Sequence, residues 1–146
     1  MNILFFLTPK SEVAYIHDTD SLRQALEKME NHRYSAIPII SKKEGRYMGT
    51  MTEGDLLWFI KDKGDLSVRE AEDISIMDVP RKWDNEPVDV DVNMENLINK
   101  VMNQNYVPVI DDDKRFIGII TRKDVIQYLS KKLVKMELEA GGMRID

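Results

Sequence analysis

Two copies of the pattern Thr-x-x-Asp are the residues of this sequence best suited to chemistry. The first is Thr52-Glu53-Gly54-Asp55 and the second is Thr121-Arg122-Lys123-Asp124. At the start of a helix, a threonine hydroxyl and free backbone N–H groups can bind a phosphate, which the helix dipole also favours. A carboxylate one turn into the helix can accept hydrogen bonds from both hydroxyls of a ribose. The same residues also make an ordinary helix cap, which is the commoner case, so the pattern alone leaves both a cap and nucleotide binding open.

Residues for enzyme chemistry do not accompany these motifs. The sequence has no cysteine, so it offers neither a thiolate nucleophile nor a thiolate metal ligand. Its two histidines, His17 and His32, have no acidic neighbour at a spacing typical of metal ligands. There is no P-loop and no nucleophile paired with a base. We therefore expect no catalysis, no metal and no cofactor, and the alternative of nucleotide hydrolysis lacks an evident general base.

The composition indicates a folded protein that binds neither nucleic acid polymers nor membranes. Of its 146 residues, 42% are hydrophobic and 32% are charged, which suits a packed interior under a well-solvated surface. The net charge of -5 disfavours a polynucleotide-binding surface, which needs clustered cations. No window approaches the roughly 18 to 20 apolar residues of a membrane span. The apolar start, residues 1–7, lacks the basic leader of a signal peptide, so we expect a soluble, cytoplasmic protein.

The two motifs belong to an internal repeat. Segments 22–29 and 94–101 both carry apolar residues at i, i+3, i+4 and i+7, the pattern of an amphipathic helix. A proline-containing apolar run follows each helix, at Ala36–Ile40 and at Tyr106–Ile110. After a polar turn, a second apolar run leads into Thr-x-x-Asp and another helix. We therefore predict that each copy folds in the order strand, helix, strand, strand, helix.

An α/β fold follows, in which the two copies pack on each other, because one short sheet cannot bury its apolar face alone. The opening strands are predicted near Val13–Ile16 and Val88–Val90. We place the first domain at 1–62, a charged linker with some helix at 63–75, the second domain at 76–138 and a flexible tail at 139–146.

These repeats resemble the CBS domain, over nearly the whole chain from residue 6 to residue 133. The segments that carry the resemblance are 34–38 with 49–55 in the first copy and 106–108 with 118–124 in the second. The resemblance implies a pair of CBS domains, or Bateman module, packed as a pseudo-two-fold disc. It further implies a homodimer that binds adenosine derivatives in clefts between the copies, as regulatory ligands and not as cofactors.

The resemblance also implies two clefts, each combining the base pocket of one copy with the Thr-x-x-Asp of the other. Cleft one would hold the base with residues of the first copy and the phosphate and ribose with the second: Val13, Ala14, Tyr34, Ser35, Ala36, Ile37, Pro38, Thr121, Arg122 and Asp124. Cleft two would use Thr52, Asp55, Val88, Asn105, Tyr106, Val107 and Pro108.

Cleft two departs from the family pattern. The bulky Tyr106 stands where a small residue is usual, and Glu53 stands where cleft one has Arg122 and would repel a phosphate. We therefore expect the ligand in cleft one, with Arg122 facing its phosphate.

A narrower resemblance is to the stand-alone bacterial CBS proteins that bind cyclic di-AMP and dock onto a partner enzyme. It is carried by Asp78–Arg81, Glu12–Ala14, Tyr34–Pro38 and Thr121–Lys123. Two departures, the acid Glu12 where a base is expected and the retained ribose acid Asp124, keep AMP, ADP and ATP open. The expected function is a sensor that binds an adenine nucleotide and signals to an unknown protein partner. The alternative is a ligand-free dimerisation and interaction module.

Overall fold

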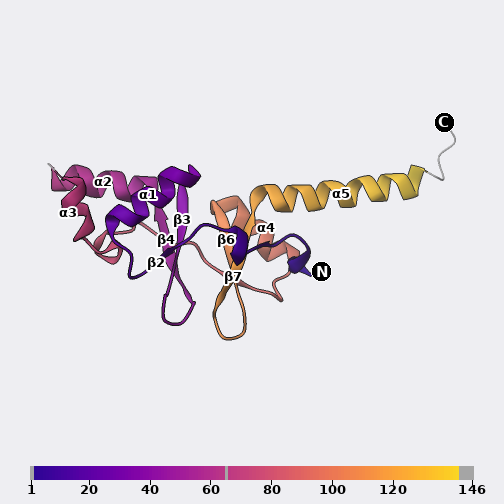
Figure 1. The fold of residues 1–146 in the computed structure, drawn as a ribbon. Helices are drawn as coiled ribbons and strands as arrows, with labels where there is room; N and C mark the ends of the chain where they lie inside the picture. Colours follow the sequence, from indigo (N-terminus) through magenta and orange to yellow (C-terminus); the bar gives the residue numbers. More distant parts are fainter. Residues whose placement is uncertain (1, 65, 142–146) are drawn as a thin grey trace.

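Two repeats of the same fold make up the computed structural model, which describes residues 2–64 and 66–141 (Figure 1). The predicted order of strand, helix, strand, strand, helix is confirmed in both repeats. The first repeat comprises β2 (Ile16–His17), α1 (Leu22–His32), β3 (Ala36–Ile40), β4 (Tyr47–Thr52) and α2 (Glu53–Lys63). The second comprises β5 (Val88–Asp89), α4 (Met94–Asn103), β6 (Tyr106–Ile110), β7 (Phe116–Thr121) and α5 (Arg122–Gly141).

Both sheets share one topology and register. The opening strand pairs in parallel with the proline-containing strand, which pairs antiparallel with the next, giving the order β2-β3-β4 in the first repeat and β5-β6-β7 in the second. Pro38 lies opposite Thr50, and Pro108 lies opposite Ile119. Each proline precedes the two-residue parallel ladder, so its missing N–H interrupts no hydrogen bond of that ladder. The two repeats therefore place equivalent residues in equivalent positions.

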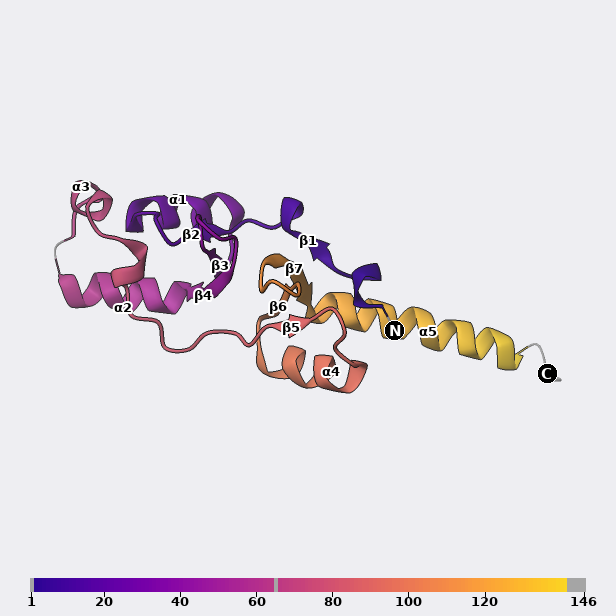
Figure 2. The same cartoon turned by 90° about the horizontal axis from the view of Figure 1, so that it is seen from below.

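Each of the two segments that precede the repeats in the chain packs on the other repeat: the N-terminal segment on the second and the connecting segment on the first. The N-terminal segment, η1 (Ile3–Phe5), β1 (Thr8–Pro9) and η2 (Lys10–Glu12), runs along the second repeat, where β1 pairs with β7 and Ile3 enters the core. The connecting segment, residues 66–87, contains α3 (Val68–Glu72) and η3 (Ile76–Asp78), which pack on the first repeat. Each core is thus completed by residues from beyond its own repeat. Figure 2 shows the course of both segments along the repeats that they join.

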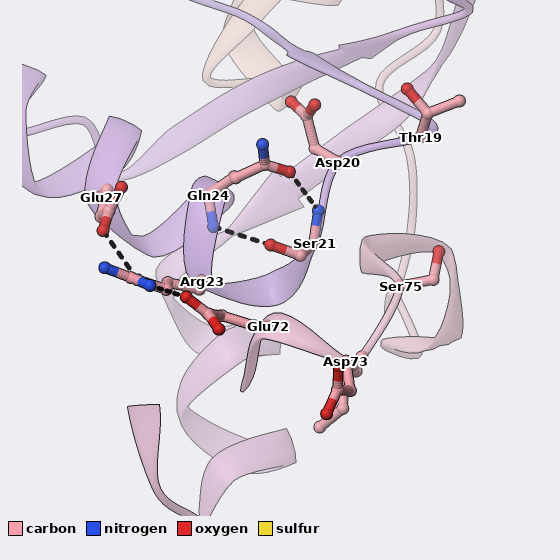
Figure 3. Close-up of a pocket in the computed structure, with 10 residues that line it drawn as sticks. Thr19, Asp20, Ser21, Arg23, Gln24, Glu27, Glu72, Asp73 and Ser75 are labelled. Atoms are coloured by element: carbon pink, nitrogen blue, oxygen red, sulfur yellow. Dashed lines mark hydrogen bonds and ion pairs between the residues drawn. The ribbon is translucent and has the colours of Figure 1, made fainter. Parts of the chain in front are cut away.

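Helix α3 is attached to the start of α1 (Figure 3). Arg23 forms ion pairs with Glu27 and Glu72, and the Leu22 N–H donates to the Ile74 carbonyl at 2.8 Å. Part of the predicted linker therefore packs within the first repeat, as do Ile76 and Val79 beyond it. At the other end, residues 139–141 are the last residues of α5, and residues 142–146 of the predicted flexible tail lie outside the described residues.

The two repeats meet through their sheets and hairpins. Val13, Ile40 and Phe116 form a small apolar cluster that joins both repeats. The Phe116 N–H donates to the Gly45 carbonyl at 2.9 Å, which ties the two hairpin loops side by side at the lower edge in Figure 1. Across the described residues, no helix is long and apolar enough to span a membrane.

Gly118 is the position where β1 approaches β7 most closely. A methyl group at Gly118 would overlap the Thr8 carbonyl oxygen, whereas at Gly54 it would meet only the Thr52 hydroxyl, at 3.7 Å. We expect Gly118→Ala to lower the free energy of unfolding by about 1–3 kcal/mol, because β1 must move away from β7. The control Gly54→Ala should raise it by about 0.5–1 kcal/mol through helix propensity. Urea denaturation measures both, and equal effects would contradict the close approach.

Candidate functional site

Both Thr-x-x-Asp motifs form reciprocal helix caps. The Thr52 hydroxyl accepts from the Asp55 N–H at 3.1 Å, and Asp55 Oδ2 accepts from the Thr52 N–H at 3.2 Å. The corresponding distances for Thr121 and Asp124 are 3.1 and 2.9 Å. The cap interpretation therefore holds for both copies, and it leaves Oδ1 of each carboxylate free of the cap.

The two remaining carboxylate oxygens have different surroundings. Oδ1 of Asp55 accepts from the backbone N–H of Lys82 at 3.2 Å. Among the described residues, no hydrogen bond is donated to Oδ1 of Asp124. The acid of cleft two is thus engaged by Lys82, whereas the acid of cleft one keeps one oxygen that accepts no hydrogen bond from the described residues.

A network of hydroxyl groups fills cleft two. Tyr106 is buried, and its hydroxyl bonds the hydroxyl of Thr50, which also bonds the hydroxyl of Tyr47. The Thr50 N–H donates to Asp84 at 2.9 Å, and Arg81 forms an ion pair with the same carboxylate at 2.9 Å. Asp84 also lies against Gly49, where a side chain would clash with it. The connecting segment and Tyr106 therefore close this cleft from both sides.

The remaining cleft-two residues are mostly part of the core. Val88, Val107 and Pro108 are buried in the second repeat, whereas Asn105 is exposed. The Tyr106 carbonyl accepts from the side-chain amide of the buried Asn85 at 3.0 Å. This arrangement supports a structural role for cleft two.

Cleft one lacks the counterpart of the Tyr106 contact. In the sheet, Ala36 lies opposite Thr52 as Tyr106 lies opposite Thr121, so a methyl group stands where cleft two has a phenol ring. Ile119 takes the position of Thr50 and carries no hydroxyl. Cleft one therefore has neither the side chain nor the hydrogen bond that fills cleft two.

The predicted base-pocket residues of cleft one differ in burial, and Val13 lies at the contact between the repeats. Val13 is only 8% exposed and belongs to the apolar cluster that includes Phe116 of the second repeat. Ala14 and Ala36 are half-buried, whereas Ile37 and Pro38 are buried. The exposed Ser35 accepts from the Glu53 N–H through its carbonyl at 2.9 Å.

Tyr34 and Arg122 point to other neighbours. Tyr34 stacks on His32 and lines an apolar groove between α1 and α2. The Arg122 guanidinium donates to the carbonyls of Val101 and Gln104 at 2.8 and 3.3 Å, at the end of α4. The negative end of that helix dipole compensates a cation in the first turn of α5. The predicted contacts of Tyr34 and Arg122 with a nucleotide stay predictions, and both side chains have other partners in this structure.

Sequence reasoning missed the residues that close cleft two. Tyr47, Thr50 and Asp84 were not selected, because their roles depend on contacts across the chain. The segment Asp78–Arg81, which carries part of the narrower resemblance, came closest to identifying them, because it lies directly before Lys82 and Asp84.

Comparison with known proteins identifies the family. The model of the CBS domain matches residues 6–62 and 65–131, so the chain belongs to the CBS domain family. An uncharacterized protein of Methanocaldococcus jannaschii is 22% identical, over 90% of this chain and 51% of its own length. Inosine-5'-monophosphate dehydrogenase of the same organism is 28% identical over 80% of this chain, which spans only 21% of that enzyme.

Other relatives match along most of their length. Cyclic di-AMP receptor B of Bacillus subtilis is 26% identical, over 88% of this chain and 86% of its own. The crystal structure of CbpB in complex with c-di-AMP superimposes with a TM-score of 0.82 and 26% identity, covering 95% of this chain and 91% of that one. CbpB from Streptococcus agalactiae gives a TM-score of 0.74 and 29% identity, covering 88% and 79%.

The hydroxyl network leads to a prediction about tyrosine ionisation. Burial raises the pKa of Tyr47 from 10.0 to about 12 and raises the pKa of Tyr106 well above 10.0. The neutral phenols stabilise the fold fully below pH 10, and this stabilisation is lost as the pH rises through about 12. Ultraviolet titration should therefore show two of the five tyrosines ionising late, and Tyr47→Phe and Tyr106→Phe should each remove one. Five tyrosines ionising together near pH 10 would contradict the network.

Proposed function

We propose that this chain is a regulatory module that binds an adenine nucleotide in cleft one. The observation that carries the proposal is the difference between the two clefts. In cleft two, the buried Tyr106 bonds Thr50 and the Lys82 N–H donates to the acid, whereas cleft one has the small Ala36 and an acid with one oxygen left for a ligand. The same fold thus offers one filled site and one site suited to an adenosine.

Each part of cleft one suits a different part of the ligand. The apolar residues expected around the base are Val13, Ala36 and Pro38, whereas the Ile37 side chain is fully buried in the core of the first repeat. Asp124 supplies an acceptor for ribose hydroxyls, and Thr121 begins α5, whose N-terminus attracts a phosphate.

Cyclic di-AMP is the first candidate ligand. Two relatives that match nearly the full length of this chain are a cyclic di-AMP receptor and a protein crystallised with that nucleotide. AMP, ADP and ATP are the second candidates, because the retained Asp124 suits the ribose of any adenosine derivative. Since Val13 links the repeats, a ligand beside it would alter their packing and so the surface offered to a protein partner.

A ligand-free interaction module is the competing function. It is favoured by apolar side chains on α2 and α5 that are exposed in the single chain. A thermal-shift screen with cyclic di-AMP, AMP, ADP and ATP separates the two functions, because a ligand that binds only the folded state raises the melting temperature. No shift with any of the four nucleotides at millimolar concentration would support the competing function.

Asp124→Ala and Asp55→Ala form a matched pair, because both remove an equivalent helix cap. We expect Asp124→Ala to weaken nucleotide binding at least about tenfold, since a charge-assisted hydrogen bond contributes about 1.5–3 kcal/mol. Asp55→Ala should change it much less, because that acid already bonds Lys82. Titration calorimetry measures both affinities. Equal losses would show that the ligand occupies the other cleft or both.

Ala36→Tyr reproduces in cleft one the residue that fills cleft two. We expect it to reduce nucleotide affinity more than about a hundredfold, because the phenol ring would take the position of the base. The control Ala36→Ser keeps the side chain small and should bind within about threefold of the parent. Calorimetry on folded variants measures the effect, and unchanged binding by Ala36→Tyr would exclude the base from this pocket.

A further inference from the structure

Helix α5 continues well beyond the body of the protein. Its first turns pack on the second repeat, where Val125 is buried and Tyr128 stacks on Phe6 with 4.8 Å between ring centroids. Residues 130–141 are all exposed, and Figures 1 and 2 both show this half of the helix projecting away from the two repeats. The projecting half therefore receives no support from tertiary packing.

A projecting helix of this length needs a partner. Helical segments shorter than about 12–15 residues are only marginally stable in water, and most helices in proteins are stabilised by an apolar face that packs. The projecting half also carries large apolar side chains, with exposed fractions of 59% for Leu133, 56% for Met136 and 72% for Leu138. Such a surface is typical of an interaction site.

Part of this apolar surface forms a single stripe with the spacing of a helix pair. Ile126, Leu133 and Ala140 are seven residues apart, and Met136 lies three residues after Leu133. This is the a and d spacing of paired helices over two heptads. Leu129, three residues after Ile126, is half-buried against the core of the second repeat. Leu138 lies on the opposite side of the helix, five residues beyond Leu133, and does not belong to the stripe.

The charged residues beside the stripe favour pairing with an identical helix in parallel. Lys132 directly precedes Leu133 and Glu137 directly follows Met136, so they flank the stripe on its two sides. In a parallel pair of identical helices, a residue before an a position faces the residue five places later on the partner. Lys132 of each chain would therefore face Glu137 of the other, and the two-fold axis makes this pair twice.

We propose that the projecting half of α5 pairs in parallel with the same segment of a second copy of this chain. The interface consists of Leu133, Met136 and Ala140, with the Lys132 and Glu137 pairs on its flanks. This pairing stabilises the free helix and fixes the two copies around one axis, whether or not a nucleotide is bound. The competing acceptor is the apolar groove of about 560 Å³ between α1 and α2 of the other copy, whose rim includes Glu30, Arg33 and Glu53.

Because the chain has no cysteine, single cysteines test the pairing directly. In a parallel pair, both Met136 positions lie at the seam, within the span that a disulfide requires. Under mild oxidation, Met136→Cys should therefore form a covalent dimer almost completely. The control Leu138→Cys, which is more exposed but outside the stripe, should form at least about tenfold less. Equal or absent cross-linking overturns the proposal.

A charge exchange tests the orientation. Lys132→Glu should raise the dimer dissociation constant about tenfold, because two attractive pairs become repulsive. Adding Glu137→Lys should restore the parent value. Light scattering measures both, and a parent particle of 17.0 kDa at micromolar concentration overturns the proposal. A dimer that persists unchanged after Leu133→Asp would place the interface on another surface and would also overturn it.

Discussion

The hydroxyls of Thr50 and Tyr106 bond each other across cleft two, and neither residue is more than 5% exposed. A buried hydroxyl that loses its partner costs about 1–3 kcal/mol, so this contact is stable only while the two sheets keep their relative position. Asp84 meets the same point through the Thr50 N–H. One strand from each repeat and the segment that connects the repeats are thus held together there, and the filling of cleft two is a consequence.

The contact between Thr50 and Tyr106 depends on the same segments that complete the cores of the two repeats. The first repeat needs Ala71 and Ile76 from the connecting segment, and the second needs Ile3 from the N-terminus. Units this small bury only a modest share of their surface, so each additional apolar side chain matters. Both flanking segments pass beside the contact between the repeats, and one of them carries Asp84 into it. The connecting segment therefore completes a core and closes a cleft at the same time.

The sequence was sufficient for the local structure and for the repeat, because both depend on residues close together in the chain. The amphipathic helices predicted from the apolar spacing of segments 22–29 and 94–101 are present as α1 and α4. The bond between Thr50 and Tyr106 joins residues 56 positions apart, and its two partners occupy non-equivalent positions in the two copies. Comparison of the copies could flag Tyr106 as unusual, but it could not identify Thr50. Arg122 is a second example: the sequence predicted that it faces a phosphate, whereas its guanidinium donates to carbonyls at the end of α4 that are about 20 positions away in the chain.

The two clefts are formed by equivalent positions of the two repeats, so the difference between them can be expressed as a free energy of nucleotide binding. A nucleotide that entered cleft two would have to break the hydrogen bonds from Thr50 to Tyr106, from Thr50 to Asp84 and from Lys82 to Asp55. At about 1 kcal/mol net for each, the cost is roughly 3 kcal/mol, which corresponds to more than a hundredfold in affinity. The acid of cleft one carries no such cost, because its second oxygen is free of any bond within the described chain. Preference for one cleft therefore requires no stronger attraction of the ligand there, since the hydrogen bonds already made in cleft two are sufficient.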